Sequence, residues 1–206
     1  MFQKNKKGMT IIEMLIAIAI FTIGIQGFTM LFMKSWKSNA YIFEMGQASS
    51  AVSEGLNKMV KYIRMARQGD DGNYAIKSAD DNELVIFSDY DKDGIGERLH
   101  FKFENGQMTM GITKPTGSYP KTYPDGDQET VIIADKIVND SETPVFYYFN
   151  KDYPGDQANN PVATPADVSN IRLAKIFLKI NIDPGKGPEN IEMQSFVEFR
   201  NLNDYN

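Results

Sequence analysis

The sequence predicts an α+β fold in which one long N-terminal α-helix packs on a mainly antiparallel β-sheet. Three observations predict it. From Met14 to Met33 there are 20 residues without a charge, and apolar residues then recur at every third or fourth position as far as Ile63. After residue 72 the pattern changes to alternation of apolar and polar residues, with turn residues at regular intervals. The 206 residues suffice for one globular domain and a long helix.

The uncharged stretch has the length of a membrane-spanning helix, which needs about 20 apolar residues. A cleavable secretory signal begins similarly, but its apolar core is only about 7–15 residues long. Lys4, Lys6 and Lys7 precede the stretch and favour a cytoplasmic N-terminus. We therefore expect a single-pass protein of the cytoplasmic membrane, with its C-terminal part on the outer side.

Beyond Met33 the helix is expected to continue as an amphipathic segment that ends at the turn cluster of residues 69–72. Its apolar stripe is formed by Met45, Ala48, Val52, Leu56, Met59 and Ile63. Its opposite face is formed by Lys58, Lys61, Arg64 and Arg67. Gly24 and Gly27 lie inside the helix and indicate either local bending or melting, or close packing against neighbouring helices.

The remaining chain is expected to form strands, with the stripe of the helix covering the sheet. The candidates are Glu83–Ser88, Glu97–Phe103, Gln107–Thr113, Glu129–Ala134, Val145–Phe149, Ile171–Ile182 and Ile191–Arg200. Asn105-Gly106 predicts a tight hairpin, because these residues tolerate the positive φ that such turns need. The prolines between Phe149 and Ile171 predict a long loop.

Charge and composition exclude some partners. Residues 68–206 hold 13 basic against 24 acidic residues, which argues against a nucleic-acid backbone as a partner and suits divalent cations better. The absence of cysteine excludes disulfides and thiolate metal sites. One histidine, no phosphate-binding glycine loop and no nucleophile beside a base predict that the protein is not an enzyme.

The segment Gly8-Met9-Thr10-Ile11-Ile12-Glu13 lies where the basic leader meets the apolar helix. It resembles the cleavage and methylation signature of type IV prepilins and type II secretion pseudopilins. The resemblance implies that a prepilin peptidase and N-methyltransferase cuts after Gly8 and methylates the new amine of Met9. It divides the chain into a cleaved leader (1–8), a transmembrane and polymerisation helix (9–33), an amphipathic continuation (34–69) and a β-rich extracytoplasmic domain (70–206).

Glu13 is the acidic residue of this signature, and its position has a physical logic. A charged side chain inside a membrane helix costs about 2.5–3.5 kcal/mol unless it finds a partner. Cleavage creates a cationic amine at Met9, which can pair with Glu13 of the same or a neighbouring subunit. A head-to-tail contact of this kind that does not close generates a helical filament. A carboxylate that merely reaches water at the interface is the simpler alternative.

The resemblance implies a structural subunit of a type IV pilus, a type II secretion filament or a DNA-uptake filament. Its partners would be the peptidase, other pilin or pseudopilin subunits, an inner-membrane assembly platform and membrane lipid. Family members often have a proline in this helix, whereas none occurs here before Pro115, and Met9 replaces the more familiar Phe. Both departures favour a minor pilin or pseudopilin. The closing segment 195–201 is similar to the last strand of the PilW and GspJ-like group, and the retained Glu13 argues against a tip subunit.

A second motif lies between two of the expected strands. Its D-x-D-x-D-G spacing resembles the first half of an EF-hand loop, in which alternate side-chain oxygens hold Ca²⁺. The candidate ligands are Asp89, Asp91, Asp93, the carbonyl of Ile95, and Glu97. His100 stands where an EF-hand has its bidentate Glu, and strands replace the flanking helices. A solvated acidic hairpin is therefore the alternative, and Asp125, Asp127, Asp152 and Asp156 are expected in exposed turns.

Two interpretations remain open for the chain as a whole. It is either a filament subunit or a single-pass, membrane-anchored, calcium-dependent binding or adhesion module that never polymerises. Glu13 distinguishes them, because a permanent anchor gains nothing from a carboxylate in its membrane helix. His100 alternates with Leu99 and Phe101 and is expected to have a structural role.

Overall fold

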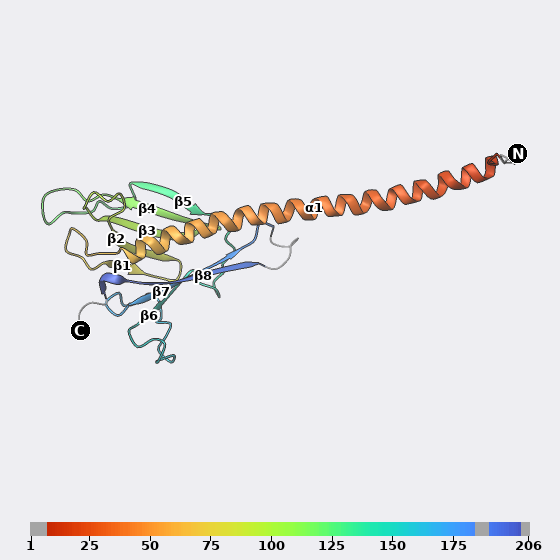
Figure 1. Cartoon of the computed structure of the whole chain (residues 1–206). Helices are drawn as coiled ribbons and strands as arrows, with labels where there is room; N and C mark the ends of the chain where they lie inside the picture. The colour runs from red at the N-terminus through yellow and green to blue at the C-terminus, as the bar shows by residue number, and fades with distance from the viewer. Residues whose placement is uncertain (1–7, 184–189, 203–206) are drawn as a thin grey trace, which may run out of the picture. The chain divides into compact units, whose positions relative to one another are not determined.

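The computed structural model describes residues 8–183 and 190–202, and it divides into two compact units, Met1–Glu44 and Met45–Asn206. The helix α1, Ile11–Arg64, contributes to both units (Figure 1). It is helical throughout, so the expected long helix is confirmed and Gly24 and Gly27 neither melt nor interrupt it. Both glycines have open space around them, since a Cβ added to either would meet nothing within 4 Å.

Within residues 65–183 and 190–202, eight strands follow the helix and confirm the α+β prediction. They are β1 (Ile76–Ala79), β2 (Glu83–Ser88), β3 (Glu97–Glu104), β4 (Gln107–Thr113), β5 (Glu129–Ala134), β6 (Phe146–Phe149), β7 (Leu173–Ile180) and β8 (Ile191–Glu198), with a short 3₁₀-helix at Arg200–Leu202. All their pairings are antiparallel, and they form two sheets, ordered β1-β2-β3-β4-β5 and β6-β7-β8. The seven expected strands are confirmed, with ends shifted by at most two residues.

The hairpin between β3 and β4 forms as the Asn-Gly pair predicts. Glu104 pairs with Gln107, so only Asn105 and Gly106 form the turn, with φ of 52° and 77°. Positive φ at both central residues matches the right-handed twist of the strands, which fixes the register of this hairpin. The expected long loop between β6 and β7 is also present.

The C-terminal part of α1 is the apolar layer that packs on the strands of the second unit. Its buried residues are Met45, Val52, Gly55, Leu56, Met59, Tyr62 and Ile63. The expected stripe is therefore confirmed except for Ala48, which is half-buried. Gly55 is the closest point of approach: a Cβ there would overlap the carbonyl oxygen of Ile133 in β5 and lie 3.2 Å from the Cβ of Ala134.

Tyr148 connects the two sheets. Its side chain is fully buried, and its hydroxyl donates to the carbonyl oxygens of Asp80 (2.9 Å) and Glu83 (3.3 Å) beside the first sheet. Burial raises the pKa of Tyr148 well above the usual value. The phenol therefore stays protonated and keeps its donor role at any ordinary pH.

The close approach at Gly55 predicts that Gly55→Ala lowers the free energy of unfolding by about 1–3 kcal/mol, the usual cost of an overpacked core. This loss should appear although Ala is favoured over Gly inside helices by about 1 kcal/mol. Gly46→Ala is the matched control, because Gly46 lies in the same helix and a Cβ there meets nothing within 4 Å. We expect it to be neutral or slightly stabilising. Denaturant unfolding of both variants in detergent tests this, and equal effects would contradict the tight contact.

Candidate functional site

The first candidate site is the segment that enters α1. Gly8, Met9 and Thr10 are exposed and precede the first helical residue, Ile11. Their peptide bonds lie outside the hydrogen-bonded helix, which is the condition a peptidase needs to reach a backbone. A Cβ added to Gly8 would meet nothing within 4 Å, so the chain's own packing does not require glycine there.

Thr10 and Glu13 form a reciprocal capping box at the start of the helix. The backbone N–H of Thr10 donates to Oε2 of Glu13 at 2.8 Å, and its hydroxyl donates to the same oxygen at 3.0 Å. In return, the N–H of Glu13 donates to the Thr10 hydroxyl at 3.3 Å. The box fixes where the helix begins, two residues after Met9, and holds the carboxylate near the positive end of the helix dipole.

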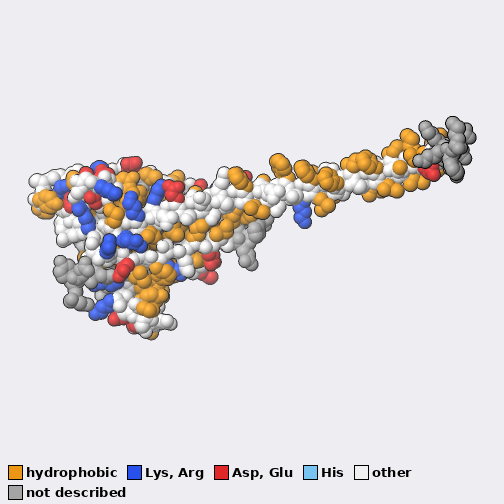
Figure 2. Space-filling model, in the orientation of Figure 1, with side chains coloured by type: hydrophobic (Ala, Val, Ile, Leu, Met, Phe, Trp, Pro, Cys, Tyr) orange, Lys and Arg blue, Asp and Glu red, His pale blue; other side chains and the backbone are white. Residues whose placement is uncertain are grey.

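The rest of the first unit is an apolar helix surface. Side chains from Ile11 to Met33 are exposed, among them Ile23 at 71% and Met30 at 75%, and Figure 2 shows hydrophobic side chains along this part of α1. Within the described residues α1 is long and apolar enough to cross a membrane. A continuous apolar surface of this kind needs lipid or protein around it. Glu13 is the one ionisable residue between Met9 and Met33.

The hydroxyl groups of two threonines within this surface form hydrogen bonds to the helix backbone. The hydroxyl of Thr22 donates to the carbonyl of Ile18, and that of Thr29 to the carbonyl of Ile25, both at 2.8 Å. Hydroxyls bonded to the preceding helical turn need no water, so they fit an apolar environment. The carboxylate of Glu13 thus remains the one side chain of this segment with a charge to neutralise.

Comparison with known protein families gives a match at the N-terminus. Residues 3–25 match the model of the prokaryotic N-terminal methylation motif. The matched range contains Gly8, Met9 and Glu13, so it supports a type IV pilin-like protein that is processed by prepilin peptidase. No curated protein matched the chain.

The second candidate site is the connection between β2 and β3, where the acidic motif lies. Carboxylate oxygens of Asp89, Asp91 and Glu97 lie within 4.8 Å of one another. Asp93 is outside this group, and its Oδ1 accepts the N–H of Ile95 at 2.8 Å. The structure therefore brings together three of the four expected carboxylates and uses the fourth to fold the loop.

The three clustered carboxylates differ in their burial and in their hydrogen-bond partners. Glu97 is fully buried, and this desolvation raises its pKa although the N–H of Tyr90 donates to Oε2 at 2.8 Å. Asp91 is exposed and pairs with Nζ of Lys114 at 2.6 Å, and this hydrogen bond lowers its pKa. Asp89 is half-buried, and its Oδ2 accepts the N–H of Gly94 at 3.1 Å.

The sequence analysis did not predict the side chains that contact this loop from other parts of the chain. Arg67 was expected on the exposed face of the helix, but it lies past the last helical residue and donates to the carbonyl of Gly94 at 2.8 Å. That prediction was wrong because α1 ends at Arg64, and the chain beyond it turns toward the sheet. Tyr123 donates to the carbonyl of Gly96, and burial raises its pKa to about 12. No spacing in the sequence points to such contacts across 27 residues.

The other acidic candidates lie elsewhere. Oδ2 of Asp127 accepts a hydrogen bond from Nδ1 of His100 at 2.8 Å, and Nε2 of His100 is 3.2 Å from Oε1 of Glu83. His100, in β3, thus contacts both β2 and the segment that precedes β5, in keeping with a structural role. Asp156 forms an exposed turn by accepting the N–H groups of Ala158 and Asn159.

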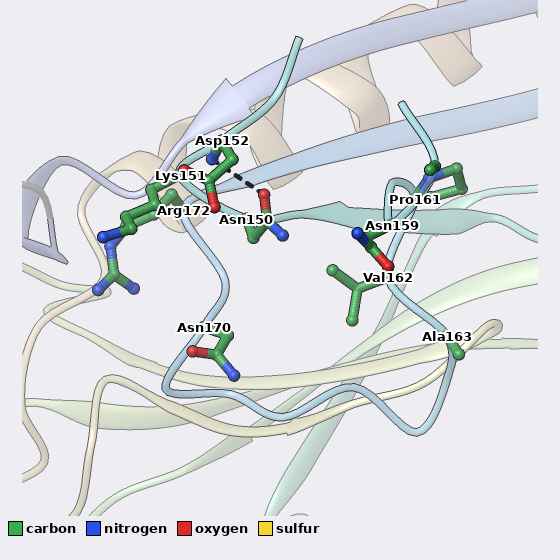
Figure 3. A pocket seen from close by; sticks show the side chains of 10 residues that line it. Asn150, Lys151, Asp152, Asn159, Pro161, Val162, Ala163, Asn170 and Arg172 are labelled. Atoms are coloured by element: carbon green, nitrogen blue, oxygen red, sulfur yellow. Dashed lines mark hydrogen bonds between the residues drawn. The ribbon is translucent and has the colours of Figure 1, made fainter. Parts of the chain in front are cut away.

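The loop from β6 to β7 encloses an open hollow of about 680 Å³ (Figure 3). Its lining mixes polar and apolar side chains and includes Asn150, Asn159 and Asn170. The N–H of Asp152, another lining residue, donates to Oδ1 of Asn150 at 2.9 Å (Figure 3). The amide of Asn160 donates to the same oxygen at 2.9 Å. These hydrogen bonds join residues of the same loop and stabilise its fold. The hollow is therefore a consequence of the loop's own conformation.

Proposed function

We propose that this protein is a minor pilin or pseudopilin, a structural subunit of a type IV pilus, a type II secretion filament or a DNA-uptake filament. Prepilin peptidase cuts the chain after Gly8 and methylates Met9. The matched methylation motif carries this proposal, because it contains the scissile position and the carboxylate in one segment. Before assembly the chain is a single-pass protein of the cytoplasmic membrane with its N-terminus inside.

The geometry at the helix start supports a specific role for Glu13. In the uncut chain the carboxylate accepts two hydrogen bonds from Thr10, so it is not an isolated charge. Cleavage places a cationic amine on Met9, four residues before Glu13, and a carboxylate can accept from both donors at once. The same amine on a neighbouring subunit offers an equivalent partner. This ion pair would form at only one axial offset between the two subunits, so it would stabilise that offset in a filament.

The exposed apolar helix supports the polymerisation role. Its residues from Ile11 to Met33 need a partner in place of lipid once the subunit leaves the membrane. Neighbouring copies of the same kind of helix are such a partner. Gly24 and Gly27, which have open space around them, allow close approach between packed helices.

The finer assignment to the PilW and GspJ-like group rests on the closing segment 195–201. Its first part belongs to β8, and Val197 and Phe199 are buried in the second unit. The departures at Met9 and the absence of a proline before Pro115 favour a minor subunit in the same way. A permanently anchored calcium-binding module is the second candidate, favoured only by the acidic β2–β3 loop with its buried Glu97.

Co-expression with each of the three filament machines tests this proposal. A tagged chain, made alongside the subunits and assembly platform of one machine at a time, should appear in the sheared or sedimented filament fraction of one of them. Immunodetection of that fraction is the measurement. A chain that stays in the membrane fraction with every machine would favour the anchored module.

A further inference from the structure

The loop between β2 and β3 contains buried carboxylate oxygens that nothing in the described chain satisfies. Glu97 is fully buried, and its Oε1 has no hydrogen-bond partner among the described residues. Oδ1 of Asp89 is buried and unpartnered in the same way. Burying an anionic oxygen without a partner is costly, so such atoms favour a site where these oxygens bind a cation.

The two residues with unpartnered oxygens belong to one cluster. Asp89, Asp91 and Glu97 each offer a carboxylate oxygen, and these atoms lie within 4.8 Å of one another. Oxygens on opposite sides of a calcium ion are about 5 Å apart, since each Ca–O distance is about 2.3–2.6 Å. Oxygens that lie within 4.8 Å of one another can therefore all reach one calcium ion. Calcium is favoured over magnesium because three carboxylates converge here, whereas magnesium usually takes one or two carboxylates and keeps several of its waters.

The backbone of the loop holds these side chains in place. Lys92 and Gly94 have φ of 64° and 87°, which reverses the chain within a few residues. The N–H of Gly94 bonds to Asp89, and the N–H of Asp93 bonds to Oδ1 of Asp91 at 3.3 Å. Side chains fixed by short local bonds lose little further freedom when they bind an ion.

The charge balance of the cluster favours a divalent cation. Three carboxylates meet at this point, and the described structure pairs Lys114 with Asp91 alone. Arg67 bonds to Asp70 at 3.3 Å and to the carbonyl of Gly94. Lys92, in the loop itself, is exposed and pairs with none of the three carboxylates in the described structure. Asp89 and Glu97, the two residues with buried, unpartnered oxygens, therefore have no basic side chain paired with them among the described residues.

From these observations we propose that the β2–β3 loop binds one calcium ion through Asp89, Asp91 and Glu97. Glu97 is the inner ligand, because it is fully buried. Asp91 exchanges its ion pair with Lys114 for the metal, and Asp93 shapes the loop without being the principal ligand. The site is independent of cleavage and assembly, since it uses none of the residues of the N-terminal segment.

Binding has a structural consequence for the second unit. Tyr62, near the end of α1, contacts the ring of Tyr90 at a centroid distance of 5.4 Å, and Arg67 holds the carbonyl of Gly94. The loop thus joins the end of the helix to the first sheet. An ion that fixes the loop stabilises this junction, so calcium should protect the folded domain against unfolding.

Calorimetric titration of CaCl₂ into the full chain in detergent, after treatment with a chelator, tests the proposal. We expect one ion per chain with a Kd of roughly 10⁻⁵–10⁻³ M, between sensor loops and extracellular modules, because the bidentate Glu of an EF-hand is missing. Magnesium should bind at least about tenfold more weakly. The absence of binding at 10 mM calcium, on the order of ten times the upper expected Kd, would overturn the proposal, and equal binding of magnesium would overturn its choice of ion.

Three variants locate the site. Glu97→Gln keeps the shape but removes the charge, and we expect affinity to fall at least about tenfold. Lys114→Met frees Asp91 from its ion pair and should raise affinity roughly two- to fivefold, a gain that misfolding cannot produce. Asp152→Asn, in the β6–β7 loop, is the matched control and should change nothing. Unchanged affinity in Glu97→Gln, or a loss in Asp152→Asn, would refute the assignment.

Discussion

A chain with Glu13→Ala should enter the membrane and lose its leader normally, yet be absent from filaments. The carboxylate is not needed for insertion, because its removal makes the apolar segment more apolar. Its pairing with the Met9 amine is a charge-assisted bond worth about 1.5–3 kcal/mol. That corresponds to a roughly 10- to 100-fold loss in subunit association. Comparing the variant's abundance in membrane and filament fractions measures the effect.

The capping box requires a control, because Glu13→Ala also removes a helix cap. Glu13→Gln keeps that role, since Gln serves in capping boxes as well as Glu, but it removes the charge. Thr10→Ala does the reverse, removing the side-chain half of the box and keeping the charge. We expect Glu13→Gln to fail in assembly and Thr10→Ala to assemble.

The opposite pattern would change the interpretation. If Glu13→Gln entered filaments as well as the original chain while Thr10→Ala did not, the helix start and not the ion pair would be the determinant of assembly. Normal incorporation of Glu13→Ala itself would refute the pairing of Glu13 with Met9.

The second large effect concerns the scissile position. Gly8→Val should leave the leader attached and yield almost no mature chain, because a branched side chain displaces the peptide bond in the peptidase. A misplacement of about 1 Å costs on the order of 100-fold in rate. Folding should not be affected, since Gly8 is exposed and has open space around it.

Met9→Phe is the matched control on the other side of the same bond. It restores the residue more familiar in this family, so we expect normal cleavage. Electrophoretic mobility of the chain with and without co-expressed prepilin peptidase distinguishes cut from uncut forms. Efficient cutting of Gly8→Val would contradict the proposed cleavage site.

The elements set by local patterns were predictable from the sequence. Unbroken hydrophobicity and a 3.6-residue period identified α1, and the alternation of residues 176–182 identified β7. Asn105-Gly106 fixed the β3–β4 register through its positive φ. β1 was missed because it has only four residues and contains Lys77 and Ser78. The division of the strands into two sheets has no local signature either.

The contacts between distant segments were not predictable. Gly55 reads in the sequence as a residue that weakens the helix, whereas the structure shows that it lets α1 approach the backbone of Ile133. The motif spacing named Asp89, Asp91 and Glu97 as ligands, but it gave Asp93 the same weight. Only the fold shows that Glu97 is buried with an unpartnered oxygen and that Lys114 pairs with Asp91.

The most direct test of the central claim is the intact mass and N-terminal sequence of the chain after co-expression with a prepilin peptidase. The filament-subunit account predicts a mature protein that begins with methylated Met9 and has lost residues 1–8. An uncut chain, under conditions in which a control prepilin is processed, would contradict it.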